Sequence, residues 1–90
     1  MEYEWDETKN AANRREHGID FSLVEIFNWD FAQFDIDDRE DYGELPEIAT
    51  GYIGDVLHVL IFTDREEVIR VISLRKANKK ERRAFGQRAR

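Results

Sequence analysis

The chain has 90 residues, no cysteine, and 20 Asp and Glu against 14 Lys and Arg, which gives a formal net charge of −6. This length suits a single domain over residues 1–90, and the absence of cysteine excludes a disulfide framework and a thiolate metal site. The start, MEYEWDETKN, lacks the regions of a signal peptide, and the longest apolar run, VLHVLIF, is too short to span a bilayer. We therefore expect a soluble, cytoplasmic domain without membrane contact.

The first third of the chain predicts a short strand and two helices. The segment EYEW alternates as a strand does, and Asp6 is placed to cap a helix that runs to about His17, with Gly18 as its C-cap. Lys9, Asn13 and His17 recur every four residues along one stripe of this helix. The sequence SLVE then fits a capping box before a second, short helix that ends near residue 28.

Four strand-like segments and a final helix are predicted in the rest of the chain. The segment FAQFD alternates, and after an acidic loop over 36–46 three runs rich in β-branched residues follow: EIATGYI, DVLHVLIFT and EEVIRVISLR. The short gaps between these runs are typical of hairpins. Asn78 and Glu81 form a capping box, NKKE, for a last helix. This order predicts an α+β fold with an antiparallel sheet of about four strands and helices packed on one face.

The basic residues are concentrated at the C-terminal end. Residues 68–90 contain nine Lys and Arg and one acid, net +8, whereas residues 1–67 contain five basic and 19 acidic residues, net −14, and the two sum to −6. Such an end attracts phosphate, because each Lys or Arg placed on a phosphate releases counterions. The alternative is a solvated helix that only keeps the protein soluble. Direct DNA binding is opposed by the net negative charge and by the lack of helix-turn-helix spacing.

No metal or cofactor chemistry is indicated by the sequence. His17 and His58 lie far apart without a carboxylate at ligand spacing, and the acidic loop misses the EF-hand spacing. RNA supplies its own nucleophile, the 2′-hydroxyl, so a protein cleaves it by removing that proton, stabilising charge on the phosphate and protonating the leaving oxygen. We therefore expect no cofactor and no metal, and a metal-free cleavage of RNA if the protein is an enzyme.

The segment EVIRVISLR carries the arginines best suited to hold a phosphate. A period of two places Arg70 with Leu74 on one face of this strand, and Ser73 and Arg75 with Val71 on the other. Each face then combines an arginine with apolar residues. Such an arginine is either a charge that reaches solvent from the strand end or a phosphate ligand.

Three segments of the chain resemble BrnT-type toxins of bacterial type II toxin–antitoxin modules: WDETKNAANRREHGIDF, DDREDYGE and FTDREEVIRVISLRKANKKERRAF. The resemblance runs from Trp5 to about Phe85. It implies a RelE-like α+β fold, a metal-independent endoribonuclease that arrests translation, and inhibition by a cognate BrnA-like antitoxin. Operator DNA is then bound only through the antitoxin. The alternative is a non-catalytic binding module or degenerate toxin that acts only as antitoxin partner and co-repressor.

The resemblance assigns roles to individual residues. Candidates for catalysis are Arg70, Arg75, Glu81 and His17. Candidates for substrate binding are Lys9, Arg65, Ser73 and Lys76, to which the basic C-terminal end adds Lys79, Lys80 and Arg83. The two catalytic arginines are expected to stabilise charge on the phosphate, while Glu81 is either a base or only part of the capping box. His17 either moves a proton near neutral pH or serves as the partner of a helix end.

Other positions of the resembling segments have structural roles or depart from the family's pattern. Trp5 and Phe21 are expected in the core, and Gly18 at a helix end. Departures from the pattern are Leu45 and Pro46 in place of a polar pair, Phe85 in place of a frequent tyrosine, and Leu74 in place of a usual alanine. A phenyl ring at the tyrosine position can stack on a base but cannot exchange a proton. Leu74 is expected to enlarge a side chain beside the site.

Overall fold

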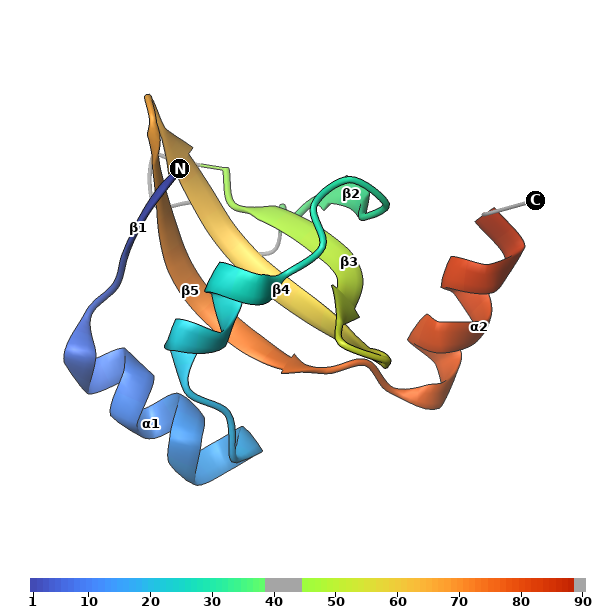
Figure 1. Ribbon diagram of the computed structural model, residues 1–90, viewed down its shortest axis with the longest axis horizontal. Helices are drawn as coiled ribbons and strands as arrows, with labels where there is room; N and C mark the ends of the chain where they lie inside the picture. The colour runs from blue at the N-terminus through green and yellow to red at the C-terminus, as the bar shows by residue number, and fades with distance from the viewer. Residues whose placement is uncertain (39–44, 89–90) are drawn as a thin grey trace.

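The computed structural model of the protein describes residues 1–38 and 45–88 (Figure 1). Its elements are β1 (Glu2–Glu4), α1 (Glu7–His17), the 3-10 helix η1 (Phe21–Ile26), β2 (Gln33–Ile36), β3 (Glu47–Ile53), β4 (Val56–Arg65), β5 (Val68–Lys76) and α2 (Lys79–Arg88). Most of the predicted acidic loop, residues 39–44, lies outside the described residues. None of the described helices is long and apolar enough to cross a membrane.

The α+β prediction is confirmed, but the sheet has five strands where about four were predicted. Their order is β1-β5-β4-β3-β2; β1 runs parallel to β5 and the other pairs are antiparallel. The difference is the EYEW segment, which joins the sheet beside β5 with Tyr3 opposite Ile69. A parallel pair needs a long connection. Here all the residues between β1 and β5 form that connection. A pairing over such a distance cannot be predicted from a local sequence pattern.

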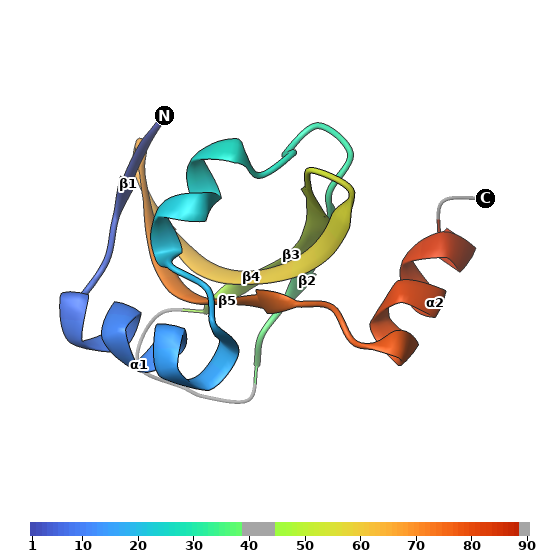
Figure 2. The same cartoon turned by 60° about the horizontal axis from the view of Figure 1, so that its bottom comes forward.

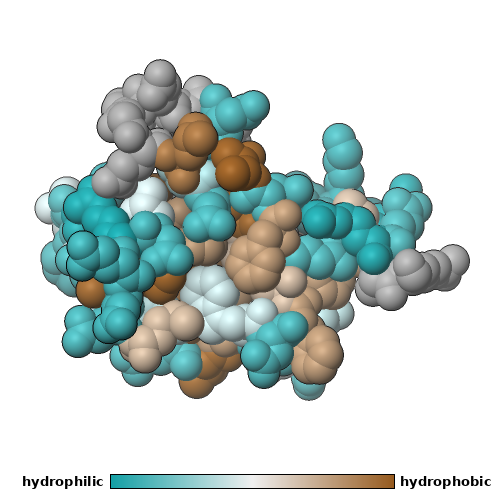
Figure 3. Space-filling model, turned by 90° about the horizontal axis from the view of Figure 1, so that it is seen from above, coloured by the Kyte–Doolittle hydropathy of each residue, from teal (hydrophilic) through white to brown (hydrophobic). Residues whose placement is uncertain are grey.

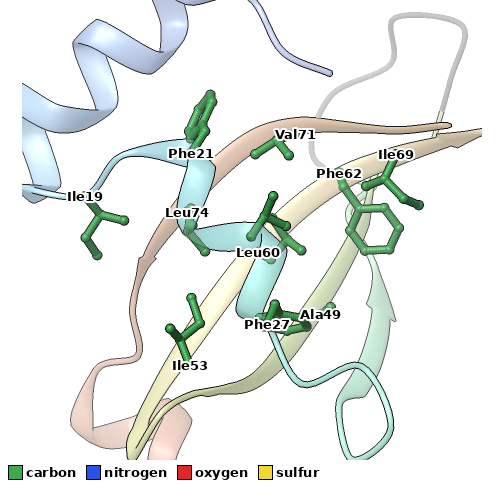
Figure 4. Packing of buried hydrophobic residues seen from close by; sticks show 11 residues of the cluster. Ile19, Phe21, Phe27, Ala49, Ile53, Leu60, Phe62, Ile69, Val71 and Leu74 are labelled. Atoms are coloured by element: carbon green, nitrogen blue, oxygen red, sulfur yellow. The ribbon is translucent and has the colours of Figure 1, made fainter. Parts of the chain in front are cut away.

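The main core lies between η1 and the concave face of the curved sheet (Figures 2 and 4). Phe21 and Val24 of η1 are fully buried there against Leu60 of β4 and Leu74 of β5. Trp5 packs against this cluster with its ring edge-to-face to Phe21, at 6.2 Å between centroids. The predicted core positions of Trp5 and Phe21 are thus confirmed.

A second, smaller apolar cluster lies on the other face of the sheet. Leu57 and Val59 alternate along β4 with residues of the main core, and they pack with Ala77, Ile48 and Phe85. The predicted packing of all helices on one face is therefore wrong. Phe85 brings α2 to this second face because the outward side chains of β3 and β4 are themselves apolar and need cover.

Helix α1 follows its predicted capping signals. The Asp6 carboxylate accepts hydrogen bonds from the N–H groups of Thr8 and Lys9, at 2.8 and 3.4 Å. Gly18 ends the helix with φ +72°, a left-handed conformation that costs glycine little, and its N–H donates to the Arg14 carbonyl at 2.8 Å. Both predicted ends of α1 are confirmed.

The start of the second helix differs from the prediction. Asp20, two residues before Ser22, caps η1 by accepting the Ser22 N–H at 2.9 Å. The predicted SLVE capping box is therefore wrong. Asp20 also accepts a hydrogen bond from Arg14 at 2.6 Å, which ties the start of η1 to α1. The Ser22 N–H and the Arg14 guanidinium together hold the pKa of the Asp20 carboxyl far below its usual range.

Strand β5 contains a β-bulge. Ser73 pairs with Ile61, and Val71 pairs with the next residue of β4, Phe62, so Ile72 is one residue more than β4 can match. A bulge changes the phase of side chains along a strand, because two successive residues then oppose one. The period of two used for the sequence therefore fails beyond this point.

The bulge corrects the predicted faces of β5. Leu74 is fully buried in the main core on the same side as Val71 (Figure 4). Arg70, Ser73 and Arg75 are partly exposed and occupy the other face, whereas strict alternation had separated the two arginines. Leu74 also does not enlarge a side chain beside the site, because it points away from Arg75 into the core.

Gly51 offers a test of the packing between β3 and the segment after η1. A Cβ atom at this position would lie 2.8 Å from Cζ of Phe27 and 3.2 Å from Cβ of Ala32. We expect Gly51→Ala to lower the free energy of unfolding by about 1–3 kcal/mol, measured by urea unfolding, because the core must shift to admit the methyl group. Gly86 in α2 has open space around it, so Gly86→Ala is the control and should raise stability by up to about 1 kcal/mol. Equal effects of the two substitutions would contradict this packing.

Candidate functional site

The second face of β5 and the adjoining start of α2 form the candidate site. Arg70, Ser73 and Arg75 project from this face, and their partners on β4 are Thr63, Ile61 and Val59, respectively. Arg75 is the member of this group that lies next to α2, through its contact with Glu81. The structure thus brings three of the predicted site residues onto one surface and adds a fourth from α2.

A hollow of about 260 Å³ opens beside Arg75. Its lining residues are Ile36, Asp37, Asp38, Ile48, Val59, Ile61, Arg75 and Glu81. The apolar members come from β2, β3 and β4, and the charged members stand at its sides. A second hollow of about 210 Å³, between β2, β3 and α2, shares Ile48 and Glu81 with the first. The two hollows therefore adjoin along the base of α2.

Arg75 and Glu81 form a two-pronged ion pair. Nη1 and Nη2 of Arg75 donate to Oε1 and Oε2 of Glu81, both at 2.7 Å, and the two side chains are 30% and 28% exposed. This planar geometry fixes the guanidinium more firmly than a single contact would. The Arg75 hydrogen bonds are the main cause that lowers the pKa of Glu81, against the opposing effect of its burial, with a further contribution from the Asn78 N–H. Glu81 is therefore ionised at neutral pH and is a weak proton acceptor.

The predicted capping box of α2 is confirmed. Glu81 Oε1 accepts the Asn78 N–H at 2.8 Å, and the Asn78 side chain accepts the Glu81 N–H at 2.8 Å. One carboxylate thus caps α2 and holds Arg75. The orientation of the guanidinium and the start of the helix are consequently coupled.

Arg70 also has an acidic neighbour. Its Nη1 lies 3.7 Å from Oε1 of Glu4 on β1, the strand that pairs with β5 at this residue, and its side chain is 35% exposed. Ser73 stands between the two arginines in sequence and is partly buried. Positive charge on this face is therefore balanced by carboxylates from β1 and from α2.

Four cations that follow Arg75 in the sequence are exposed to solvent. Lys76 ends β5 and is exposed, and so are Lys79, Lys80 and Arg83 on α2. The opposite stripe of α2 faces the sheet: the Phe85 ring packs edge-to-face on Tyr52 at 5.6 Å, and Arg88 pairs with Asp35 at 3.0 Å. Helix α2 thus attaches to the sheet through one stripe and presents its lysines to solvent.

Three predicted residues lie away from Arg75. Lys9 is exposed on α1, Arg65 is exposed at the end of β4, and His17 is the last residue of α1, with Nε2 4.0 Å from a carboxylate oxygen of Glu16. Across residues 1–38 and 45–88, Lys9 and His17 make no hydrogen bond or ion pair with the arginines of the site. In the same ranges no three His, Asp or Glu side chains are arranged to hold a metal ion.

Two asparagines of α1 are buried; sequence reasoning placed Asn13 on a polar stripe of this helix but gave neither Asn13 nor Asn10 a role. Asn13 is 6% exposed, and its Nδ2 donates to the carbonyls of Ile19 and Leu74, at 2.9 and 2.8 Å. Its Oδ1 accepts the Leu74 N–H at 3.3 Å. Asn10 is 2% exposed and accepts the Phe21 N–H at 2.9 Å. The available signal was two asparagines three residues apart in a helix with few large apolar residues.

The Arg75–Glu81 pair gives a prediction for stability against pH. A carboxyl whose pKa is lowered by folding stabilises the protein above its ordinary pKa, here 4.5, and this contribution is lost as the pH falls through the folded value. We expect Glu81→Gln to lower the free energy of unfolding by about 1 kcal/mol at pH 7 and by much less at pH 3. Denaturant unfolding at both pH values measures this difference.

The matched control is the more exposed Asp35–Arg88 pair, which also joins α2 to the sheet. Asp35→Asn should change stability less than Glu81→Gln at pH 7, because solvent screens an exposed pair. An effect of Glu81→Gln that is the same at both pH values would show that the ion pair does not stabilise the fold.

Comparisons with known proteins agree with this geometry. The profile of the family described as "Ribonuclease toxin, BrnT, of type II toxin-antitoxin system" matches residues 5–81. The 1.1 Å crystal structure of the Brucella abortus ribonuclease toxin BrnT matches with a TM-score of 0.67 and 29% sequence identity, over 88% of this chain and 99% of that chain. No curated protein sequence matches this chain.

The family match extends over the elements that build the site. It includes α1, η1, strands β2 to β5 and the start of α2 as far as Glu81. The resemblance inferred from the three sequence segments is therefore confirmed. Since the match spans most of the chain and ends at the Arg75–Glu81 pair, the chain belongs to the BrnT family of ribonuclease toxins of type II toxin–antitoxin systems.

Proposed function

We propose that this toxin cleaves RNA endonucleolytically on the face of β5 that carries Arg70, Ser73 and Arg75, without a metal ion and with the RNA 2′-hydroxyl as nucleophile. The observation that carries the proposal is the bulge at Ile72, which leaves both arginines on one face. Negative charge concentrates on the phosphoryl oxygens as the 2′-oxygen attacks, so fixed positive groups stabilise the transition state more than the ground state.

Each part of the site has a role in this proposal. Arg75, held in plane by Glu81, contacts the scissile phosphate, and Arg70 and Ser73 extend the contact along β5. Lys76 and the lysines and Arg83 of α2 attract the RNA backbone from the side of the helix. Because the Glu81 carboxylate already occupies both amino groups of Arg75, the phosphate must share or displace that carboxylate. Glu81 then acts as an orienting partner of Arg75.

The biological setting of the proposal follows the family's description. A ribonuclease toxin of a type II module has RNA as substrate and an antitoxin as partner. We propose that this partner is BrnA-like, that operator DNA is bound only through it, and that the toxin arrests translation in the cytoplasm. We also propose that the fold is related to the RelE toxins. The net charge of −14 over residues 1–67 supports an oriented approach of RNA, because this acidic part repels phosphate and the basic C-terminal end attracts it.

A second candidate function is a non-catalytic binding module that keeps the antitoxin partner. Two observations favour it. Both amino groups of Arg75 are engaged by Glu81, and edge strand β2 exposes apolar side chains, with Phe34 45% and Ile36 59% exposed. Figure 3 shows apolar residues, in brown and tan, among hydrophilic ones on one face of the molecule. An exposed edge strand can accept a strand from a partner.

Substitution of Arg75 tests the proposed mechanism. We expect Arg75→Ala to lower kcat by roughly 10²–10³-fold, on the order of 3–4 kcal/mol, while RNA binding weakens far less. Lys80→Ala is the matched control, since Lys80 is exposed on α2 beyond the hollow. It should reduce mainly affinity and lower the slope of log affinity against log salt by about 0.7 for single-stranded RNA. Steady-state cleavage and binding at several salt concentrations separate the two effects.

The chemistry is tested with the same assay. Cleavage should survive EDTA, leave a 2′,3′-cyclic phosphate, and fail when the scissile nucleotide carries a 2′-deoxy sugar. Abolition by EDTA, cutting of the deoxy substrate, or the same kinetic profile for Arg75→Ala and Lys80→Ala would each contradict the mechanism.

Growth after induction distinguishes the two candidate functions. A catalytic toxin should arrest growth when it is expressed without its antitoxin, and Arg75→Ala should relieve that arrest. A binding module should not arrest growth in either form. Relief by Lys80→Ala to the same extent as by Arg75→Ala would indicate that the basic surface acts only through electrostatic attraction.

A further inference from the structure

Asn13 replaces a strand at the edge of β5. Strand β1 pairs with β5 from Val68 to Arg70, and within residues 1–38 and 45–88 no strand lies beside the following part of β5 on that side. The Asn13 carboxamide fills this place, because it donates to the Leu74 carbonyl and accepts the Leu74 N–H as a paired backbone amide would. Its third bond, to the Ile19 carbonyl, anchors the same side chain to the segment after α1.

The position of this contact links it to the site. Leu74 lies between Ser73 and Arg75, two residues after Ile72, where β5 departs from regular pairing. A bulged strand bends, and the direction of the side chains that follow depends on what holds the backbone there. On one side β4 holds this backbone, with Val59 opposite Arg75, and on the other side Asn13 holds it.

We propose that Asn13 is a positioning residue for RNA cleavage: by clamping both backbone groups of Leu74 it directs Arg75 toward the scissile phosphate. The inference rests on the proposed catalytic role of Arg75. The ion pair with Glu81 fixes Arg75 from the end of its side chain, and Asn13 fixes it from the backbone. Both constraints are needed, because a misplacement of about 1 Å at a reacting group can lower a rate by roughly 10²-fold.

Asn10 provides the matched control on the same helix. It is 2% exposed, against 6% for Asn13, and it also bonds to a backbone group, the Phe21 N–H at 2.9 Å. Its amide donates to the carboxylates of Glu7 and Asp20. Loss of Asn10 therefore removes one buried hydrogen bond to a backbone group and two to carboxylates, and none of the three goes to the strand that carries Arg75.

The experiment compares Asn13→Ala, Asn13→Ser and Asn10→Ala with the unchanged protein. Cleavage of RNA is measured as kcat and KM separately, with each rate divided by the folded fraction obtained from denaturant unfolding. We expect kcat to fall roughly 10- to 100-fold in the Asn13 variants, with KM nearly unchanged, and to stay near its original value in Asn10→Ala. Asn13→Ser leaves room for a water that can bridge to Leu74, so kcat should fall less in Asn13→Ser than in Asn13→Ala.

A second readout does not depend on activity. The Glu81 carboxyl is titrated by NMR in each variant, since its lowered pKa reports the hydrogen bonds from Arg75. In Asn13→Ala this pKa should rise toward its ordinary value of 4.5, whereas in Asn10→Ala it should stay where it is in the unchanged protein.

The outcomes separate this inference from the proposed function. If Arg75→Ala cleaves RNA normally, the catalytic role of Arg75 fails and the inference fails with it. If Arg75→Ala is inactive but Asn13→Ala and Asn10→Ala have the same kcat per folded molecule, only the inference is overturned. An unchanged Glu81 titration in Asn13→Ala also overturns it. Unfolding of both Asn13 variants, with Asn10→Ala folded, would assign Asn13 to stability alone.

Discussion

The extra residue in β5 at Ile72 is the constraint on which the rest of the structure depends. Before the bulge, Ile69 and Val71 face the main core; after it, Leu74 faces the same way and completes the contact with η1. Without the change of phase, Arg75 would point into the apolar core and Leu74 would point to solvent. Burial of an unpaired arginine is strongly unfavourable. The bulge therefore satisfies the core and the candidate site at the same time.

Each of the two arginines on this face has a carboxylate as its neighbour. Glu4 lies beside Arg70, and Glu81 binds both amino groups of Arg75. These partners keep partly buried cations paired in the absence of RNA, because an unpaired charge there loses solvation without compensation. Under the proposed mechanism, phosphate binding to these arginines replaces one anion by another. Such an exchange favours a ligand that carries more than one charge, which suits an RNA backbone better than a free carboxylate.

Helix α2 links the Arg75–Glu81 pair to the apolar cluster on the same face of the sheet. Glu81 caps the helix and holds Arg75, while Phe85 packs on Tyr52 one turn later. None of the described residues of α2 is buried. The helix is therefore attached by a few contacts along one stripe, and displacement of Glu81 from Arg75 weakens two of its constraints together, the cap and the ion pair.

Local signals in the sequence predicted most of the elements. The caps of α1 at Asp6 and Gly18 and the NKKE box of α2 are short-range hydrogen-bond patterns, and β3 to β5 are marked by β-branched residues between turns. The features that were not predicted depend on distant partners. Strand β1 has three residues and pairs across most of the chain, and the bulge carries no glycine or proline to mark it.

The same distinction holds for the candidate site. Arg70 and Arg75 were selected from the basic end and the family resemblance, yet their common face follows only from the bulge. Glu81 was recognised as a cap, but its ion pair depends on where α2 lies relative to β5. Asn13 was seen as part of a polar stripe, and its contact with Leu74 spans 61 residues of sequence. Sequence patterns thus identified the chemical groups, and the tertiary contacts determined their arrangement.

The most direct test of a single RNA-binding face on β5 is an NMR titration of the protein with an RNA that carries a 2′-deoxy sugar at the scissile position. Such an RNA can bind without being cut. The account predicts the largest shifts at the backbone and side-chain signals of Arg70, Ser73 and Arg75, together with a change at Glu81 as its bond to Arg75 is shared or released. Shifts confined to the outer lysines of α2, with Arg75 and Glu81 unaffected, would contradict it.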